Sequence, residues 1–279
     1  MTGGKEFDMS TLFILLTSLI ALLSSTGFAR AQTWNTTGLP QSAFEPSQSQ
    51  SDPVPRRDLS GIWDAGRDGI SGPGHVGAPF TPWAEERLKD IRPGNGPRAV
   101  TEEQINEPLN IMCDPAGFPR NVLYELRPMQ FVQTPHQVLI LYMYEKRWRV
   151  IWTDGRQLPS DPDPRWYGYS VGRWEDDYTF VVETIGVDER TWLDNAGNPH
   201  SFDMRVEERY HRVNSDTLEL TVTIDDPEAY AKPWTPRDGL PLKLMPPDTD
   251  LMEWVCAPSE AAAFKRVIDA QVKEGLQKQ

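Results

Sequence analysis

Residues Trp152–Trp174 read WTDGRQLPSDPDPRWYGYSVGRW and lie between two runs of alternating apolar residues. Three tryptophans, two tyrosines and two Asp-Pro steps occur in this stretch, which is more rigid aromatic surface than an ordinary linker carries. The proline steps also restrict its backbone. We therefore expect a structured connection between two strands at the mouth of a β-barrel, with some of its aromatic side chains near a pocket.

Alternating apolar and polar residues recur along the chain, as half-buried strands require. The clearest run places Leu218, Leu220, Val222 and Ile224 on one face and polar residues on the other. Strands are also expected at residues 58–63, 129–144, 147–152, 166–174, 178–185, 204–213, 240–244 and 251–256. Because short turns join most of these runs and strands do not alternate with helices, we predict a mainly β, antiparallel meander. We expect it to close into a β-barrel with short peripheral helices, and a β-sandwich is the alternative.

The N-terminal part of the chain carries a targeting pattern. Residues 1–31 have a cationic start, an apolar core (LFILLTSLIALL) and a small-x-small ending, which predicts a cleaved secretory signal peptide. An uncleaved N-terminal anchor is the alternative. Residues 32–57 are rich in Ser, Gln and Pro and predict a flexible leader, whereas residues 58–279 predict a single domain. The protein is thus expected to be exported, either to the periplasm or out of the cell.

Two helices are expected beside the strands. Thr81-Pro82 is a favourable helix start, with Thr as the cap and Pro at the first helical position. A C-terminal helix from about Ser259 places Phe264 and Val267 at helical spacing, with Ile268 and Val272 beside them. Such a helix is suited to packing on the outside of a sheet.

Charge and motif content limit the possible partners. The chain has 41 acidic and 28 basic residues, a net charge of −13, and so repels nucleic acid and anionic lipid. We therefore expect no nucleic-acid partner and, after signal cleavage, no membrane partner. The histidines, His75, His136, His200 and His211, have no metal-ligand spacing, and nucleotide-binding and serine-hydrolase motifs do not occur. We predict neither a metal nor a cofactor.

The chain has two cysteines, Cys113 and Cys256. In an oxidising compartment such a pair predicts a disulfide. Closing so long a loop would contribute on the order of 4–5 kcal/mol in the chain-entropy model. Two buried free thiols are the alternative. Neither cysteine belongs to a Cys-x-x-Cys motif, so nothing in the sequence indicates redox activity.

Four motifs carry a resemblance to known proteins. The stretches Asp58–Trp63 (DLSGIW), Thr153–Trp174, Glu208–Tyr210 and Ile224–Trp234 (IDDPEAYAKPW) resemble a family of secreted, uncharacterised bacterial proteins. This resemblance implies an exported single domain and carries no known activity. The Gly-x-Trp that ends in Trp63 also resembles the first strand of lipocalin and wider calycin barrels, which implies a Trp that plugs the closed end of the barrel.

Glu208 is the first candidate for acid–base chemistry. It shares a strand face with Val206 and Tyr210, so burial would raise its pKa towards the range of a general acid or base. The alternative is a structural ion pair across strands with an arginine such as Arg149 or Arg173.

His200 and Tyr167 complete the catalytic set. His200 lies at a loop end, shortly after Asp194, and a His–Asp pair at the barrel rim would be able to move protons. A solvated loop histidine is the alternative. Tyr167 is the candidate hydrogen-bond donor.

The aromatic stretch supplies the predicted ligand-binding residues. Trp166 and Tyr169 offer apolar area with a polar handle and are expected to line a pocket for an apolar or aromatic ligand. Packing at the end of the barrel is the alternative. Tyr210, Trp152 and Arg156 complete the predicted set, and the sequence Asp-Gly-Arg that ends in Arg156 indicates a turn whose arginine meets a carboxylate.

These patterns favour an exported barrel that binds a small hydrophobic or aromatic molecule. One alternative is an enzyme of the same fold that uses an acid–base pair to isomerise, cyclise, hydrate or cleave an apolar metabolite. The other alternative is a structural module of the cell envelope, which would have a filled barrel.

Overall fold

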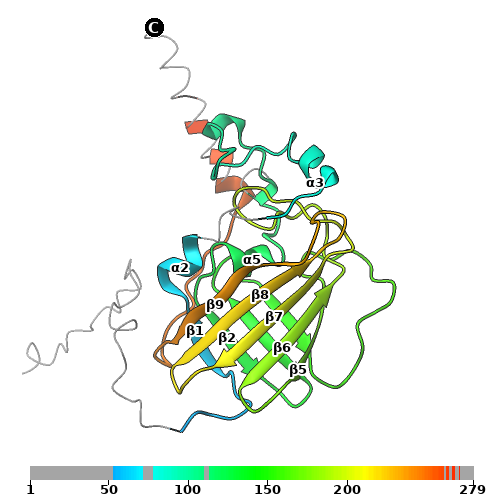
Figure 1. Cartoon of the computed structure of the whole chain (residues 1–279). Helices are drawn as coiled ribbons and strands as arrows, with labels where there is room; N and C mark the ends of the chain where they lie inside the picture. The colour runs from blue at the N-terminus through cyan, green and yellow to red at the C-terminus, as the bar shows by residue number, and fades with distance from the viewer. Residues whose placement is uncertain are drawn as a thin grey trace, which may run out of the picture. The chain divides into compact units, whose positions relative to one another are not determined.

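The computed structural model describes residues 53–71, 78–109, 113–260, 262–263, 266–267 and 270, all of which belong to one compact unit, Ser42–Gln279. The predicted signal peptide and most of the predicted leader lie outside the described residues. The described chain is dominated by strands that form one closed barrel (Figure 1). This confirms the predicted mainly β class and the barrel, and it rules out the β-sandwich.

Nine strands of the described chain make the barrel wall, in sequence order. They are β1 (Gly61–Asp64), β2 (Met129–Gln133), β3 (Gln137–Tyr142), β4 (Trp148–Trp152), β5 (Tyr169–Trp174), β6 (Thr179–Ile185), β7 (Arg205–Arg212), β8 (Thr217–Asp225) and β9 (Trp234–Leu244). Antiparallel pairing between β1 and β9 closes the ring.

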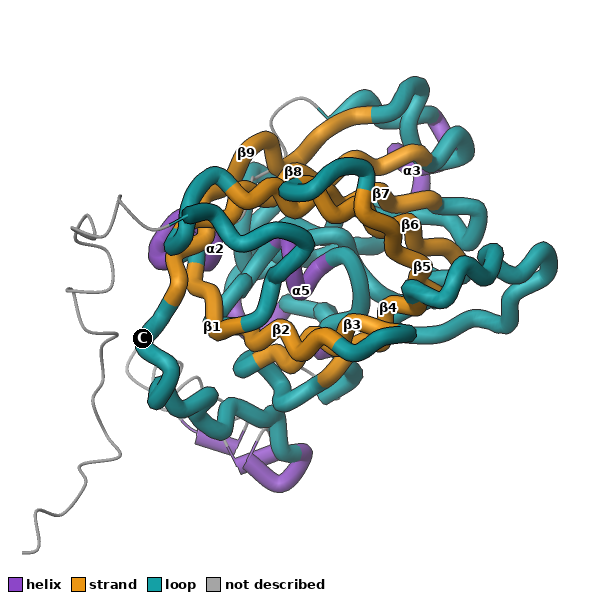
Figure 2. The backbone as a smooth tube through the Cα atoms, turned by 90° about the horizontal axis from the view of Figure 1, so that it is seen from below, coloured by secondary structure: helices purple, strands orange, loops and turns teal. Residues whose placement is uncertain are grey.

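The expectation of a fully antiparallel meander is wrong at one place, because β4 and β5 run parallel. They pair only through Ile151 with Ser170 and Trp152 with Val171. Parallel neighbours cannot be joined by a tight turn, so residues 153–168 must return along the barrel to the end where β4 began. Figure 2 shows this connection as a long loop that stands out from the wall beside β4 and β5.

Alternation along the strands fills the barrel with side chains. On β7 and β8 the inward positions are fully buried, including Val206, Tyr210, Leu220 and Val222. Their neighbours on the outer face are partly exposed, because successive side chains of a strand point to opposite faces. The predicted half-buried strand at residues 217–224 is therefore confirmed.

One end of the barrel is closed around Trp63, which is fully buried. Its indole Nε1 donates to the carbonyl oxygen of Leu59 at 2.9 Å. The guanidinium carbon of Arg212 lies 4.8 Å from the Trp63 ring centre, and its nitrogens donate to the carbonyl oxygens of Asp58 and Ser215. These bonds tie Trp63 and the start of the domain to the turn between β7 and β8.

The long segment between β1 and β2 covers the opposite end with its described residues. It contains α2 (Gly66–Ser71), α3 (Pro82–Arg87), the short 3-10 helix η2 (Glu102–Gln104) and α5 (Arg120–Leu123). Arg237 of β9 donates to the carbonyl oxygens of Asp68, Gly69 and Leu123, which ties α2 and α5 to the barrel. The predicted helix start is confirmed, since Thr81 Oγ1 accepts the backbone N–H of Ala84.

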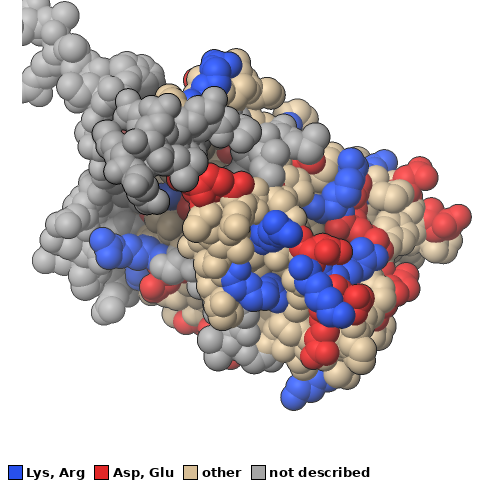
Figure 3. All heavy atoms as spheres, turned by 90° about the horizontal axis from the view of Figure 1, so that it is seen from above, with Lys and Arg blue, Asp and Glu red and all other residues tan. Residues whose placement is uncertain are grey.

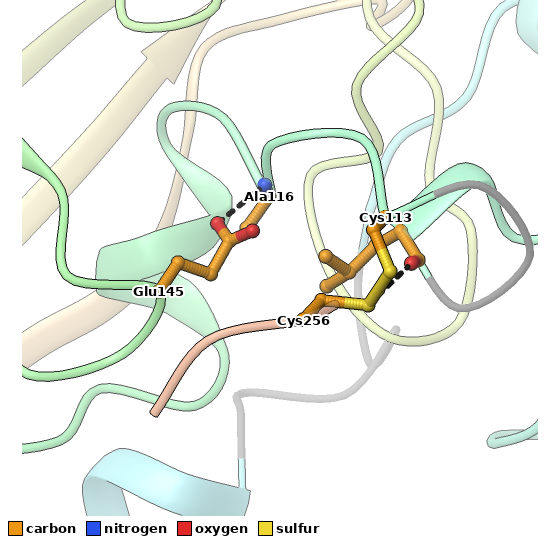
Figure 4. The surroundings of a disulfide bond; sticks show 5 residues. Cys113, Ala116, Glu145 and Cys256 are labelled. Carbon is orange, nitrogen blue, oxygen red and sulfur yellow. Dashed lines mark hydrogen bonds between the residues drawn. A yellow bond between two sulfur atoms is a disulfide. The ribbon is translucent and has the colours of Figure 1, made fainter. Parts of the chain in front are cut away.

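Cys113 and Cys256 form a disulfide, as predicted (Figure 4). It joins the segment before α5 to the chain beyond β9. The strand predicted at residues 251–256 is wrong, because this stretch makes only an isolated bridge between Trp254 and Tyr144. Helical residues begin at Pro258, but Val267, which we expected to pack on the sheet, is 54% exposed. Phe264, Ile268 and Val272 fall outside the part of the chain whose side chains are described.

The described surface mixes charges of both signs. On the face seen in Figure 3, Lys and Arg side chains lie among Asp and Glu side chains rather than in one large patch. Among the described residues, no helix has the length and hydropathy needed to cross a membrane.

Candidate functional site

The outward face of β4 and β5, together with the connection between them, forms a groove of about 540 Å³. Trp148, Val150 and Trp152 alternate on β4 with the inward, buried Arg149 and Ile151. The connection supplies the opposite wall. We call this hollow the aromatic groove, and the residues that line it are Trp148, Arg149, Val150, Trp152, Arg156, Gln157, Leu158, Pro159, Arg165, Trp166, Tyr167, Gly168, Tyr169, Ser170 and Val171.

Backbone contacts hold the end of the connection in place. Arg165 forms a bridge with Val187, and its backbone N–H donates to the carbonyl oxygen of Gly186 at 3.0 Å. The carbonyl oxygen of Trp166 accepts the N–H of Phe118 at 2.9 Å. Gly168 has a φ of +60°, and a Cβ there would lie 2.5 Å from the carbonyl oxygen of Ile185. Only glycine fits this position, so the groove has a fixed wall.

Arginines lie over the faces of the groove aromatics. The guanidinium carbon of Arg156 is 3.6 Å from the ring centre of Trp152, and that of Arg165 is 3.9 Å from the ring centre of Tyr169. Arg190, from the loop after β6, lies 4.4 Å from the ring centre of Trp166. Cation–π contacts of this kind favour a guanidinium group that rests on the face of an aromatic ring.

Trp148 is the most exposed large apolar side chain of the described residues, at 66%. It stands at the start of β4, on the face that the aromatic groove occupies. Exposing so much indole surface to water is unfavourable, since apolar area contributes roughly 25 cal/mol per Å² when it is buried. An exposed tryptophan beside a hollow is typical of a binding surface.

Arg156 is the predicted turn arginine, and the carboxylate that it meets belongs to Asp154. Its Nε lies 2.9 Å from Asp154 Oδ1 and its Nη2 lies 2.6 Å from Oδ2. This pairing lowers the pKa of Asp154 and raises that of Arg156, chiefly through the side-chain hydrogen bond. The charge of Arg156 is therefore balanced at the edge of the groove.

Tyr167 lines the groove with its ring, while its hydroxyl points to a buried carboxylate. The hydroxyl donates to Glu145 Oε2 across a long 3.5 Å contact. The same oxygen accepts the backbone N–H of Ala116 at 2.7 Å (Figure 4). Burial raises the pKa of Tyr167 and also that of Glu145, where the Ala116 N–H acts in the opposite direction.

Glu208 lies inside the barrel and forms an ion pair with Arg149, the alternative that the sequence left open. Its Oε2 is 2.6 Å from Arg149 Nη2, and its Oε1 accepts the hydroxyl of Tyr210 at 2.7 Å. Arg149 also donates to the hydroxyl oxygens of Ser170 and Thr184. Burial acts to lower the pKa of Arg149, but the adjacent Glu208 carboxylate raises it above its ordinary value.

Burial and the Glu208 charge together raise the pKa of Tyr210 well above its ordinary range. Its ring lies edge-on to Phe131 in the core, with 5.2 Å between ring centres. Neither Glu208 nor Tyr210 lines the aromatic groove. The structure thus places two of the predicted site residues in the interior of the barrel, where each is a hydrogen-bond partner of the other.

His200 is buried rather than solvated, and it lies by a different hollow of about 320 Å³. Its Nδ1 is 3.0 Å from the carbonyl oxygen of Ser201, so Nδ1 carries the proton, and its Nε2 is 2.6 Å from Thr191 Oγ1. Burial lowers the pKa of His200, which favours the neutral ring. Asp194 binds Asn198, whereas the hydrogen-bond partners of the His200 ring are Thr191 and Ser201.

A third hollow of about 290 Å³ lies on the neighbouring part of the wall, over β6, β7 and β8. Its lining includes the carboxylates of Glu183, Glu207 and Asp225. Leu158 of the connection contributes to both this acidic hollow and the aromatic groove, so the two share a border.

The structure brings together five of the predicted residues in the aromatic groove, namely Trp152, Arg156, Trp166, Tyr167 and Tyr169. The sequence reasoning missed Trp148 and Arg165. Trp148 had a usable signal, because a period of two from Trp152 places it on the same strand face. Arg165 had none, since its position depends on how the connection docks on the loop after β6.

Within the described part of the chain, no cluster of three His, Cys, Asp or Glu side chains is arranged to hold a metal ion. No family model, no curated protein and no solved structure matches the chain.

Proposed function

We propose that the protein is an exported binding protein that takes small aromatic molecules in the aromatic groove. The observation that carries the proposal is the placement of Trp148, Trp152, Trp166, Tyr167 and Tyr169 around one open hollow. Tryptophan and tyrosine rings give a planar ligand a large contact area at little cost in conformational entropy. The disulfide fits an oxidising compartment, which supports export.

Binding is favoured over catalysis because the candidate acid–base residues do not meet. Glu208 is occupied by Arg149 and Tyr210 inside the barrel, whereas His200 lies by another hollow. Tyr167 is the member of the predicted catalytic set that lines the aromatic groove, and its hydroxyl already contacts Glu145. General acid–base catalysis requires groups within hydrogen-bond reach of one substrate.

The proposal is tested by titrating the folded protein with naphthalene derivatives, both neutral and acidic, followed by calorimetry and tryptophan fluorescence. Wild-type protein is expected to bind, and Trp148→Ala and Trp152→Ala are each expected to weaken binding at least about fivefold, since one aromatic contact contributes about 1 kcal/mol or more. Trp148 is so exposed that its removal should leave the fold unchanged.

Trp254→Ala is the matched control. Trp254 is also exposed, at 42%, but it lies against Tyr144 and Arg127 and does not line the groove. It should bind the probes as wild type does. If no naphthalene derivative binds, or if Trp148→Ala and Trp254→Ala behave alike, the aromatic groove is not the binding site.

A further inference from the structure

The charges around the aromatic groove point to a narrower class of ligand. Its lining holds three arginines, Arg149, Arg156 and Arg165, and neither Asp nor Glu. This composition departs from the rest of the chain, which carries a net charge of −13. The adjacent acidic hollow is lined by Glu183, Glu207 and Asp225 against one arginine. The lining of the aromatic groove is thus richer in arginine than in acidic residues, unlike the chain as a whole.

The three arginines differ in how their charges are balanced. Arg149 is paired with Glu208 inside the barrel, and Arg156 is paired with Asp154 at the groove edge. Among the described residues, no carboxylate lies within ion-pair distance of Arg165. Its guanidinium rests on the ring of Tyr169 and is otherwise exposed.

The backbone of Arg165 is nonetheless held in place. Its backbone N–H donates to the carbonyl oxygen of Gly186, and its carbonyl oxygen accepts the N–H of Asp188 at 3.0 Å. Pro162 of the connection also packs on Gly186, where a Cβ would come within 2.8 Å. An arginine whose backbone is held and whose guanidinium rests on a ring loses less freedom on binding an anion than one on a mobile loop.

We propose that the ligand of the aromatic groove is an aromatic carboxylate, with its ring against the tryptophans and its carboxylate on Arg165. This inference rests on the proposed binding function. The planar guanidinium fork matches the geometry of a carboxylate, and hydrogen bonds between charged groups are about twice as strong as neutral ones. A neutral ring would gain the aromatic contacts and leave the charge of Arg165 unbalanced.

The experiment compares 2-naphthoate with 2-naphthamide, a neutral analogue of nearly the same shape, by calorimetric titration at neutral pH. We expect 2-naphthoate to bind roughly tenfold or more tightly than the amide, because only the carboxylate forms charged hydrogen bonds with the guanidinium of Arg165. Raising NaCl from about 50 mM to about 500 mM should reduce this preference, since salt screens exposed charges.

Arg165→Gln should abolish the preference for the acid while retaining the affinity for the amide. Arg165→Lys should keep part of the preference, because it retains the charge without the fork. Arg173→Gln is the matched control, since Arg173 lies on the outer face of β5, pairs with Glu183 at 2.6 Å and does not line the groove. It should leave both affinities unchanged.

The outcomes separate the two proposals. If neither probe binds, the proposed function fails and the ligand class fails with it. If both probes bind equally, or if Arg165→Gln keeps the full preference for 2-naphthoate, aromatic binding stands and the carboxylate proposal is overturned.

Discussion

The two sides of the barrel wall at β4 differ in how an arginine charge is balanced. On the inner face, Arg149 is matched by the Glu208 carboxylate and by two hydroxyl groups. On the outer face, Trp148 and Trp152 border a groove in which Arg165 has an aromatic neighbour but no described carboxylate partner. A charge that is fully paired in the interior contributes to the fold, whereas a charge left beside exposed rings is free to bind a ligand.

The largest expected effect comes from unpairing the inner charge. Glu208→Leu leaves the Arg149 guanidinium buried without a counter-charge, which should destabilise the protein by about 3–5 kcal/mol. The free energy of unfolding from urea denaturation measures this loss. Replacing both partners, in Arg149→Met/Glu208→Leu, should restore much of the stability because no buried charge remains.

The exposed pair Arg173–Glu183 is the control for that prediction. It joins β5 and β6 on the outside of the barrel, with side chains 57% and 43% exposed. Glu183→Gln should therefore cost no more than about 1 kcal/mol. A double substitution in the interior that is no more stable than Glu208→Leu would show that the unpaired charge is not the cause of the loss.

A smaller loss of stability is expected when alanine replaces a glycine of the connection. Gly168 and Gly155 both have a positive φ, but only Gly168 is closely packed. Gly168→Ala requires a left-handed alanine whose Cβ meets the Ile185 carbonyl oxygen, so we expect a loss of roughly 2–3 kcal/mol and weaker binding of aromatic probes. Gly155 has a φ of +84° but nothing within 4 Å of a Cβ. Gly155→Ala should cost only about 1 kcal/mol and leave binding unchanged.

Thermal unfolding and calorimetric titration of both variants measure these effects. Equal losses of stability for the two variants would mean that the close approach of Gly168 to β6 does not hold the groove wall. A stable Gly168→Ala variant with wild-type affinity would contradict the proposal that this wall is fixed.

The smallest effect concerns Glu145, which lies behind the groove and contacts Tyr167. Burial raises the pKa of Glu145 above its ordinary value, so the folded state binds this proton more tightly than the unfolded state. The stability that this group contributes is present below its unfolded pKa and is lost as pH rises through the folded pKa. Glu145→Gln should remove that dependence.

Urea denaturation of wild type and Glu145→Gln between about pH 4 and pH 8 checks the sign. The variant should gain stability relative to wild type as pH rises. A stability of the variant relative to wild type that stays constant, or that falls, as pH rises would contradict the raised pKa of Glu145.

Much of the fold follows from the strand period. Alternation predicted a strand at each position of the barrel wall, although of β9 it predicted only residues 240–244. The excess of aromatics in Trp152–Trp174 predicted a pocket beside this stretch. The same period limits what a sequence can reveal, because it sets which residues share a face but not the direction in which two strands pair. The parallel pairing of β4 and β5 was therefore missed, although the strand end at Trp152 was predicted correctly.

One further error, and one alternative that the sequence left open, have physical causes. Residues 251–256 have the composition of a strand, but a closed barrel has no free edge on which another strand can pair, and Cys256 is held by the disulfide. The interior position of Glu208 was predicted, and its pairing with Arg149 was one of two open choices. Whether Glu208 pairs with Arg149 depends on how strands far apart in the sequence are placed across the barrel. Local sequence patterns do not contain that information.

The groove exists because the number of strands in a closed barrel limits the directions in which they can run. In a closed ring, every strand can run antiparallel to both of its neighbours only if the number of strands is even. Nine described strands form this ring, so at least one neighbouring pair has to point the same way. The chain satisfies that rule at β4 and β5, and the detour along the outside that this imposes supplies the second wall of the groove.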